Sequence, residues 1–182
     1  MKLTLVRHGE TEENKHGIIQ GQKPGSLSSL GKRQVENVAK KLKNEHYDAV
    51  YSSDLKRCID TVNPIHRYHK NTVLIYSKDL RELSFGKMEG LPVFLATFGR
   101  RVGSLLNIKA PGGESWKDLN TRVKNFLNEL YQKHSRDNIL IVTHGGPIRS
   151  VQQQLEGRSR TEVMKEDVAN CSVNKFTMNK VL

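Results

Sequence analysis

The chain has 182 residues, of which 36% are hydrophobic and 27% are charged, and its formal net charge is +11. This size and composition predict one soluble domain, residues 1–182, and exclude a membrane span, because no apolar stretch approaches roughly 18 residues. The positive charge favours acidic partners, either phosphorylated small molecules or nucleic acid. Basic residues are spread along the whole chain, without a dense tract or base-stacking aromatic strand, so nucleic acid is the less favoured partner.

Segments typical of strands alternate with segments typical of helices. Apolar and β-branched runs predict strands at 2–6, 48–52, 72–76, 138–143 and 172–178. This alternation favours parallel strands that are covered by helices on both faces. The sequence therefore predicts an α/β fold, a three-layer α/β/α sandwich with a mostly parallel sheet of five to six strands.

Capping residues and apolar spacing predict the helices of the first half. Ser28 is suited to cap a helix whose apolar residues recur at helical spacing, namely Val35, Val38, Ala39 and Leu42. Asp54 is expected to open a second helix that runs to about residue 68, with a kink at Pro64. Glu12 and Glu13 are expected to complement the dipole of a short helix after Thr11.

The second half contains the strongest helical pattern. Ser115 and Asp118 resemble a capping box, and the helix that follows has one apolar face, formed by Trp116, Leu119, Val123, Phe126, Leu127, Leu130 and Tyr131. Pro147 suits the first turn of another helix after Gly145 and Gly146. The segment 91–110 fits the alternation poorly, and either a lid over a site or an extra core helix is consistent with it.

Two histidines stand where predicted strands end. His8 lies in "LVRHGE" and His144 in "IVTHGG", each followed by glycine. Taken singly, either is more often a surface or hydrogen-bonded core residue. If the two strands are neighbours, about 4.8 Å apart, both imidazoles meet at the edge of the sheet where ligands bind.

Arginines join these histidines. Arg7 precedes His8, and Arg57 lies near the start of the helix after the second strand, so both can point into the same space. Guanidinium groups match phosphate oxygens, and together with two imidazoles they form a cage for a tetrahedral dianion. The structural alternative for Arg57 is a salt bridge with Asp54 or Asp60.

Glu82 follows the third strand closely and is a candidate acid at the rim of this cage. A carboxylic acid there can protonate a leaving alkoxide. An ion pair with Arg81 would instead make Glu82 structural.

These motifs, in this order, resemble the histidine phosphatase superfamily, in its phosphoglycerate-mutase-like branch. The resemblance spans the chain through "RHGET", "QG" at 20–21, "LSSLG", "SSDLKR", "LRELSFGKMEG", "PGGES" and "VTHGGPIR". It implies a sheet with one antiparallel strand. Two departures stand out: Pro24 and Ser26 replace an aspartate and a proline common after "QG", and the chain leaves little room for a last edge strand.

The resemblance implies a role for each site residue. His8 would be the nucleophile that forms a phosphohistidine, and Glu82 the proton donor. Arg7, Arg57 and His144 would hold the phosphoryl oxygens. The substrate-binding positions would be Asn14, Gln20, Gly21 and Gly145. No metal or cofactor is implied, since arginines take over charge neutralisation.

Physical chemistry agrees with these roles. Histidine attacks only when neutral, and its free pKa near 6.5 leaves a large neutral fraction at pH 7. The two guanidiniums should lower the pKa of His8 further. Gly9 is expected to keep the approach to the phosphate open.

The leading hypothesis is a phosphatase that hydrolyses a phosphomonoester of a small metabolite. The alternatives are a phosphoglycerate mutase and a catalytically silent phosphate- or nucleic-acid-binding protein. Two features disfavour the mutase: the short stretch of 28 residues at 83–110, and the absence of the Arg-x-Tyr-Gly run that mutases carry after the glutamate. The segment 87–111 would act as a lid or insert that selects the substrate, through Lys87, Arg100, Arg101 and Lys109.

The remaining sequence features predict location and assembly. Cys58 and Cys171 have no metal or redox spacing and are interpreted as small buried residues in a reducing, cytoplasmic location. The strand pattern from residue 2 predicts no signal peptide. His66 and His69 are interpreted as a solvated helix end rather than a metal site. The assembly is expected to be a monomer or homodimer without membrane contact.

Overall fold

A five-stranded sheet forms the centre of the computed structural model, which describes residues 1–94 and 109–182. The strands are β1 (Lys2–Arg7), β2 (Ala49–Ser53), β3 (Val73–Ser77), β4 (Asn138–Thr143) and β5 (Val173–Thr177). Their order in the sheet is β3-β2-β4-β1-β5. Only β5 pairs antiparallel, with β1. The predicted α/β class and the single antiparallel strand are confirmed.

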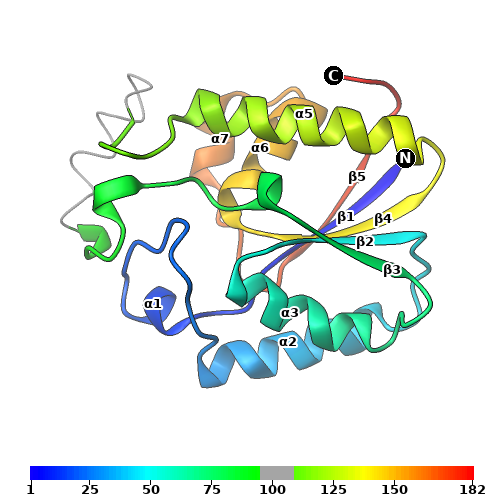
Figure 1. Cartoon of the computed structure of the whole chain (residues 1–182), viewed down its shortest axis with the longest axis horizontal. Helices are drawn as coiled ribbons and strands as arrows, with labels where there is room; N and C mark the ends of the chain where they lie inside the picture. Colours follow the sequence, from blue (N-terminus) through cyan, green and yellow to red (C-terminus); the bar gives the residue numbers. More distant parts are fainter. Residues whose placement is uncertain (95–108) are drawn as a thin grey trace.

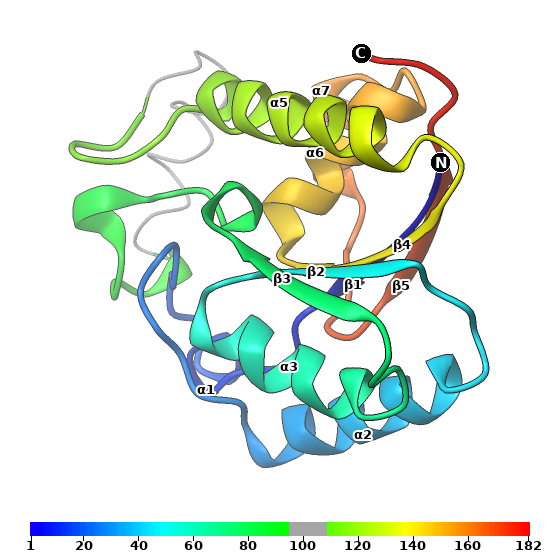
Figure 2. The same cartoon turned by 45° about the vertical axis from the view of Figure 1, so that its right-hand side comes forward.

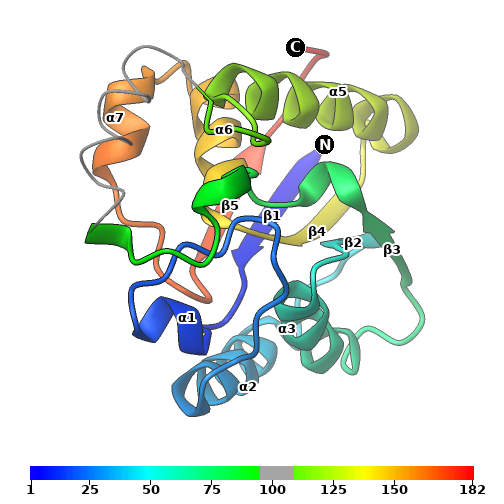
Figure 3. The same cartoon turned by 60° about the vertical axis from the view of Figure 1, so that its left-hand side comes forward.

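Helices cover both faces of the sheet (Figures 1 and 2). The described helices are α1 (Glu12–Lys15), α2 (Ser29–Leu42), α3 (Lys56–His66), α5 (Trp116–His134), α6 (Gly145–Leu155) and α7 (Arg160–Lys165), with 3-10 turns η1 (Lys78–Leu80) and η2 (Gly86–Met88). Helices α2 and α3 lie on one face, and α5 and α6 on the other. Figure 3 shows α1, η2 and α7 grouped around one end of the sheet, where β1 and β4 finish.

The core is divided in two by the sheet, because side chains alternate between faces along each strand. Leu3, Leu5, Ile139 and Ile141 pack with α5 and α6 in one buried cluster. Val6, Val50, Leu140 and Val142 pack with α2 and α3 in the other. Strands buried on both faces explain the continuous apolar runs in the sequence.

Four predicted helix starts are confirmed and one is wrong. Pro147 lies in the first turn of α6, which begins at Gly145. The Ser28 hydroxyl accepts from the amide of Gly31, and Ser115 forms a reciprocal capping box with Asp118. Thr11 caps the short α1, with Glu12 and Glu13 in its first turn. Asp54, in contrast, does not open α3, which begins at Lys56 after Leu55, because its carboxylate is engaged elsewhere.

Among the described residues, element boundaries differ from the predictions by one or two residues, and α7 and the two 3-10 turns were not predicted. Helix α7 was not predicted, since its six residues hold a single buried apolar side chain, Val163. Pro64 lies inside α3. Of the segment 91–110, residues 95–108 lie outside the described residues, so the choice between lid and core helix stays a prediction.

Two smaller interpretations need correction. His69 is not solvated: it is 8% exposed and packs against the ring of Tyr47. Cys58 is buried as expected, whereas Cys171 is partly exposed and has a left-handed backbone conformation with φ 56°. Within residues 1–94 and 109–182, no helix is long and apolar enough to cross a membrane.

Candidate active site

The two histidines meet at the ends of neighbouring parallel strands. In the pairing of β1 with β4, Arg7 stands opposite Thr143, so His8 and His144 follow at the same level. The centroids of their rings are 5.1 Å apart. The expectation that both imidazoles share one end of the sheet is confirmed, and the sheet register is the reason.

His8 is held as a neutral imidazole with one nitrogen available. Its Nδ1 lies 2.8 Å from the carbonyl oxygen of Gly9. Because a carbonyl can only accept, Nδ1 carries the proton and Nε2 keeps its lone pair. Burial lowers the pKa of His8 well below 6.5, and the charges of Arg57 and Arg7 lower it further. The pattern of the sequence predicts a lowering by the arginines alone, but burial is the larger cause.

His144 is also neutral, and its ring is fixed on both sides. The Nε–H of Arg57 donates to Nδ1 of His144 over 3.2 Å, so Nε2 carries the proton, 2.9 Å from the hydroxyl of Ser53. Burial, followed by the charge of Arg57, lowers the pKa of His144 well below 6.5. His144 therefore orients Arg57 in this structure.

Arg57 is 1% exposed, and its guanidinium is anchored by backbone oxygens. It donates to the carbonyls of Lys23, at 2.8 Å, and Gly21, at 2.7 Å. These bonds tie the loop after α1 to α3 and fix the direction of the guanidinium.

The structural alternative for Arg57 is wrong. Asp54 forms a two-bond ion pair with Arg81, and Asp60 pairs with Lys56. In the described part of the chain, no carboxylate lies within salt-bridge distance of Arg57. A buried cation without a carboxylate partner favours binding of an external anion.

Arg7, which lines the same cavity as Arg57, has a hydrogen-bond donor without a described partner, its Nε–H. Its Nη1 donates to the carbonyl of Val168, but its buried Nε has no hydrogen-bond partner among the described residues. Buried donors are almost always paired in proteins, so this one indicates where a ligand oxygen would be accepted.

Glu82 lies across from the cage, with its carboxylate at the start of α6. It accepts from the backbone amides of Leu83, at 2.8 Å, and Gly146, at 3.1 Å. A Cβ at position 146 would lie 2.2 Å from Oε1 of Glu82, so only glycine permits this approach. The suggested pair of Glu82 with Arg81 is wrong, because Arg81 binds Asp54.

These groups surround one cavity of about 420 Å³. Its lining includes seven of the predicted site residues, namely Arg7, His8, Asn14, Gln20, Gly21, Arg57 and Glu82. Two predicted site residues, His144 and Gly145, are not among the described residues that line the cavity. Gly145 still faces the cage, since a Cβ there would lie 3.9 Å from the Nε of Arg7. A direct contact of His144 with substrate stays a prediction.

Asn14 and Gln20, two polar side chains of the cavity, are joined by a hydrogen bond, and Asn170 extends this chain outside the lining. Asn14 donates to Gln20 over 3.3 Å, and Asn170 donates both to Asn14 and to the carbonyl of His8. Asn170 was missed because it lies in no recognisable motif. Gly9 has a different role from the one expected: a Cβ there would lie 2.8 Å from Val35, so Gly9 allows α2 to pack closely.

One wall of the cavity contains residues that were not predicted as site residues, namely Arg149, Arg160, Trp116 and Met164. Lys109, which was predicted to help select the substrate, lines the same cavity. Arg149 was within reach of sequence reasoning, since it lies one helical turn after Gly145 in "VTHGGPIR". Arg160 and Met164 were not, because α7 itself was not predicted.

A neutral imidazole, two guanidiniums and a carboxylate around one cavity define a phosphoryl-transfer site. In the described residues, no group of three or more histidine, cysteine or acidic side chains could hold a metal ion. The chain belongs to the histidine phosphatase superfamily (branch 1), whose sequence model matches residues 3–181. It is a hydrolase of phosphomonoesters, in line with the phosphatases among its relatives.

Named relatives cover nearly the whole chain. Phosphoserine phosphatase 1 of Hydrogenobacter thermophilus is 35% identical over 99% of this chain and 88% of its own length. Phosphoglycerate mutase-like protein 4 of Arabidopsis thaliana is 34% identical over 97% of this chain and 79% of its own. The structure of mycobacterial glucosyl-3-phosphoglycerate phosphatase with VO3 superposes with a TM-score of 0.84 at 26% identity, covering 96% and 91% of the two chains.

Proposed function

We propose that the chain hydrolyses its substrate through a covalent phosphohistidine on His8. The observation that carries this proposal is the hydrogen bond from Nδ1 of His8 to the Gly9 carbonyl. It leaves the Nε2 lone pair for attack on phosphorus, while Arg7 and Arg57 neutralise the phosphoryl oxygens.

Glu82 is the proton donor in this proposal. As the bond from phosphorus to the ester oxygen breaks, the carboxylic acid of Glu82 protonates that oxygen and the alcohol leaves. The resulting carboxylate then takes a proton from water as the water attacks the phosphohistidine. Phosphate is released, and His8 and Glu82 return to their starting states.

The substrate carries a second acidic group besides the phosphate. Among the described lining residues, five are basic (Arg7, Arg57, Lys109, Arg149 and Arg160) and two are acidic (Glu82 and Glu114). Glu114 is neutralised by an ion pair with Arg122. A phosphate dianion balances only part of the surplus, and Arg149 presents a guanidinium near Gly145 to a carboxylate or second phosphate.

The relatives support a substrate of this class. Phosphoserine and glucosyl-3-phosphoglycerate, named for two of them, both carry a carboxylate. Phosphoglycerate mutases are also among the similar structures, with a TM-score of 0.80 for the Bacillus anthracis protein. Hydrolysis is favoured over mutase transfer because the Arg-x-Tyr-Gly run after the acid is absent: the chain has Leu83, Ser84, Phe85 and Gly86.

A matched pair of substrates tests the proposal. Phosphoserine and phosphoethanolamine differ only by one carboxylate. We expect kcat/KM to be about 10-fold or more higher for phosphoserine, as a charge-assisted hydrogen bond would provide, and the preference to disappear in Arg149→Gln. Equal values for both substrates would disprove a carboxylate as the second acidic group.

The reaction type is tested separately with 3-phosphoglycerate and 2,3-bisphosphoglycerate. Incubation should release inorganic phosphate with little 2-phosphoglycerate. Rapid interconversion of the isomers without phosphate release would show a mutase instead.

A further inference from the structure

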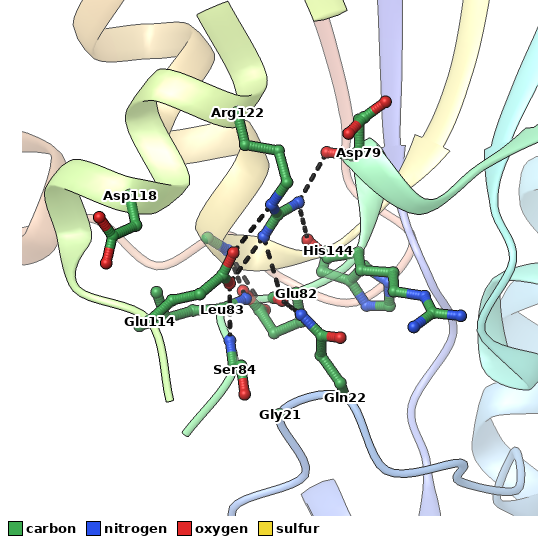
Figure 4. A network of polar contacts seen from close by, with 12 residues as sticks. Gly21, Gln22, Asp79, Glu82, Leu83, Ser84, Glu114, Asp118, Arg122 and His144 are labelled. Carbon is green, nitrogen blue, oxygen red and sulfur yellow. Dashed lines mark hydrogen bonds and ion pairs between the residues drawn. The ribbon is translucent and has the colours of Figure 1, made fainter. Parts of the chain in front are cut away.

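Arg122 of α5 lies outside the lining of the cavity yet contacts the backbone that carries Glu82. Figure 4 shows its guanidinium between Glu114 and the chain around Asp79. Its Nη1 donates to the carbonyl of Asp79, at 2.7 Å, and to that of Arg81, at 3.0 Å. Two of the three residues before the proposed proton donor are thus fixed to α5 by one side chain.

Glu114 fixes the chain on the other side of Glu82. Its two carboxylate oxygens accept from Nε and Nη2 of Arg122, at 3.0 and 2.8 Å. One of those oxygens also accepts from the backbone amide of Ser84, at 3.0 Å. The paired side chains are 16% and 23% exposed. Arg122 and Glu114 therefore bracket Glu82 with a planar, charge-assisted pair that is largely shielded from water.

The position of the Glu82 carboxylate depends on this bracket. Among the described residues, its oxygens bond only to the backbone amides of Leu83 and Gly146, and to no side chain. Within the described part of the chain, no side-chain hydrogen bond is therefore present to correct an error in the main chain. A misplacement of about 1 Å at a reacting group can cost on the order of 100-fold in rate.

We propose that Arg122 and Glu114 are positioning residues for the proton donor. They act through the backbone of residues 79–84 and hold the Glu82 carboxyl at the mouth of the phosphate cage. This inference rests on the proposed role of Glu82 as general acid.

The test is the dependence of the rate on the leaving group. Arg122→Gln should lower kcat for an alkyl phosphate such as phosphoserine at least about 10-fold more than kcat for nitrophenyl phosphate, whose leaving group needs no proton. KM should change little, because Arg122 does not line the cavity. Equal losses on both substrates would show a merely structural role.

A double variant gives the sharper result. If Arg122 acts through Glu82, adding Arg122→Gln to Glu82→Gln should cause no further loss on phosphoserine. Additive losses would overturn the inference. Equal losses for Glu82→Gln alone on both substrates would instead refute the proposed role of Glu82, so the two failures are distinguishable.

Arg158→Gln is the matched control, since Arg158 forms a comparable two-bond pair with Glu166 outside this segment. Its leaving-group dependence should equal that of the wild type. If Arg122→Gln does not fold, Glu114→Gln, which removes the charge of the same pair, replaces it. The same selective loss is expected there, and its absence counts against the proposal.

Discussion

The site joins two regions that are built in different ways. The phosphate cage stands at the ends of strands or at a helix start against the sheet. Three of its four groups are almost fully buried, since His8 is 2%, Arg57 1% and His144 0% exposed, and Arg7 is partly buried. Residues 78–90, the segment that carries the proposed acid Glu82, lie off the sheet and contain two 3-10 turns joined by a loop. The sheet register positions the first region, and side-chain contacts to backbone position the second.

This difference separates two functions within one cavity. Phosphorus and its oxygens are the same in every phosphomonoester, so the groups that handle them can be fixed in the core. The leaving alcohol varies between substrates, and we expect it to contact the wall formed by Lys109, Arg149, Arg160 and Met164. Arg149 lies on α6, but Lys109 lies in a loop and Arg160 and Met164 lie on α7, where change disturbs the core less.

Removal of the nucleophile should have the largest effect. His8→Ala eliminates the covalent route, and we expect turnover to be lost on both phosphoserine and nitrophenyl phosphate. Quenching the wild type with labelled substrate should trap acid-labile phosphate on His8. The exposed histidine variant His46→Ala should behave as the wild type, and label on a serine or cysteine would contradict the mechanism.

Removal of the proposed acid, Glu82, should lower the hydrolysis rates of different substrates unequally. Damage to the phosphate cage should lower all of them alike. Glu82→Gln is expected to slow phosphoserine hydrolysis by about 10²–10⁴-fold, the usual contribution of general acid catalysis. Nitrophenyl phosphate should lose far less, because its leaving group needs no proton. Glu36→Gln on the exposed face of α2 serves as the control, and equal losses on the two substrates would exclude the role of Glu82.

The buried histidines should make stability depend on pH. The pKa of His8 is well below 6.5 in the folded protein, whereas the unfolded chain binds a proton near pH 6.5. The free energy of unfolding should therefore fall with decreasing pH below 6.5, by up to about 1.4 kcal/mol per pH unit for this residue.

Denaturant titrations between pH 7 and 5 measure this slope. In His8→Gln, the free energy of unfolding should depend on pH with a slope smaller by one proton than in the wild type. In the folded wild type, His8 should stay neutral below pH 6.5. Identical slopes in both proteins would show that His8 is not buried as a neutral group.

Metal removal should change the activity least, because neither the phosphate cage nor the segment that carries Glu82 is expected to need a metal ion. Guanidiniums provide the charge neutralisation that a metal would provide, so activity should survive prolonged EDTA treatment and dialysis. Recovery of a chelated, inactive enzyme on addition of magnesium or zinc would contradict this expectation.

The cage was predictable from sequence because its residues follow strand patterns that are local. Arg7 and His8 end one apolar run and His144 ends another, and parallel neighbours bring such ends together. The ion pair of Arg81 with Asp54 was not predictable from such local patterns. Arg81 is adjacent to Glu82 in sequence but binds Asp54, because β2 and β3 are paired and bring 54 and 81 together.

The sequence by itself determined the α/β class, the helix caps at Ser28 and Ser115, and the identity of the cage residues, since periodicity and motifs are properties of short segments. Only the tertiary structure shows which residues contact the backbone on both sides of Glu82, the proposed acid. Arg122 and Glu114 lie 40 and 32 positions after Glu82, Arg122 inside α5 and Glu114 in the loop just before it. Their contact with residues 79–84 exists because α5 packs on the sheet beside η1, and no local pattern records that packing.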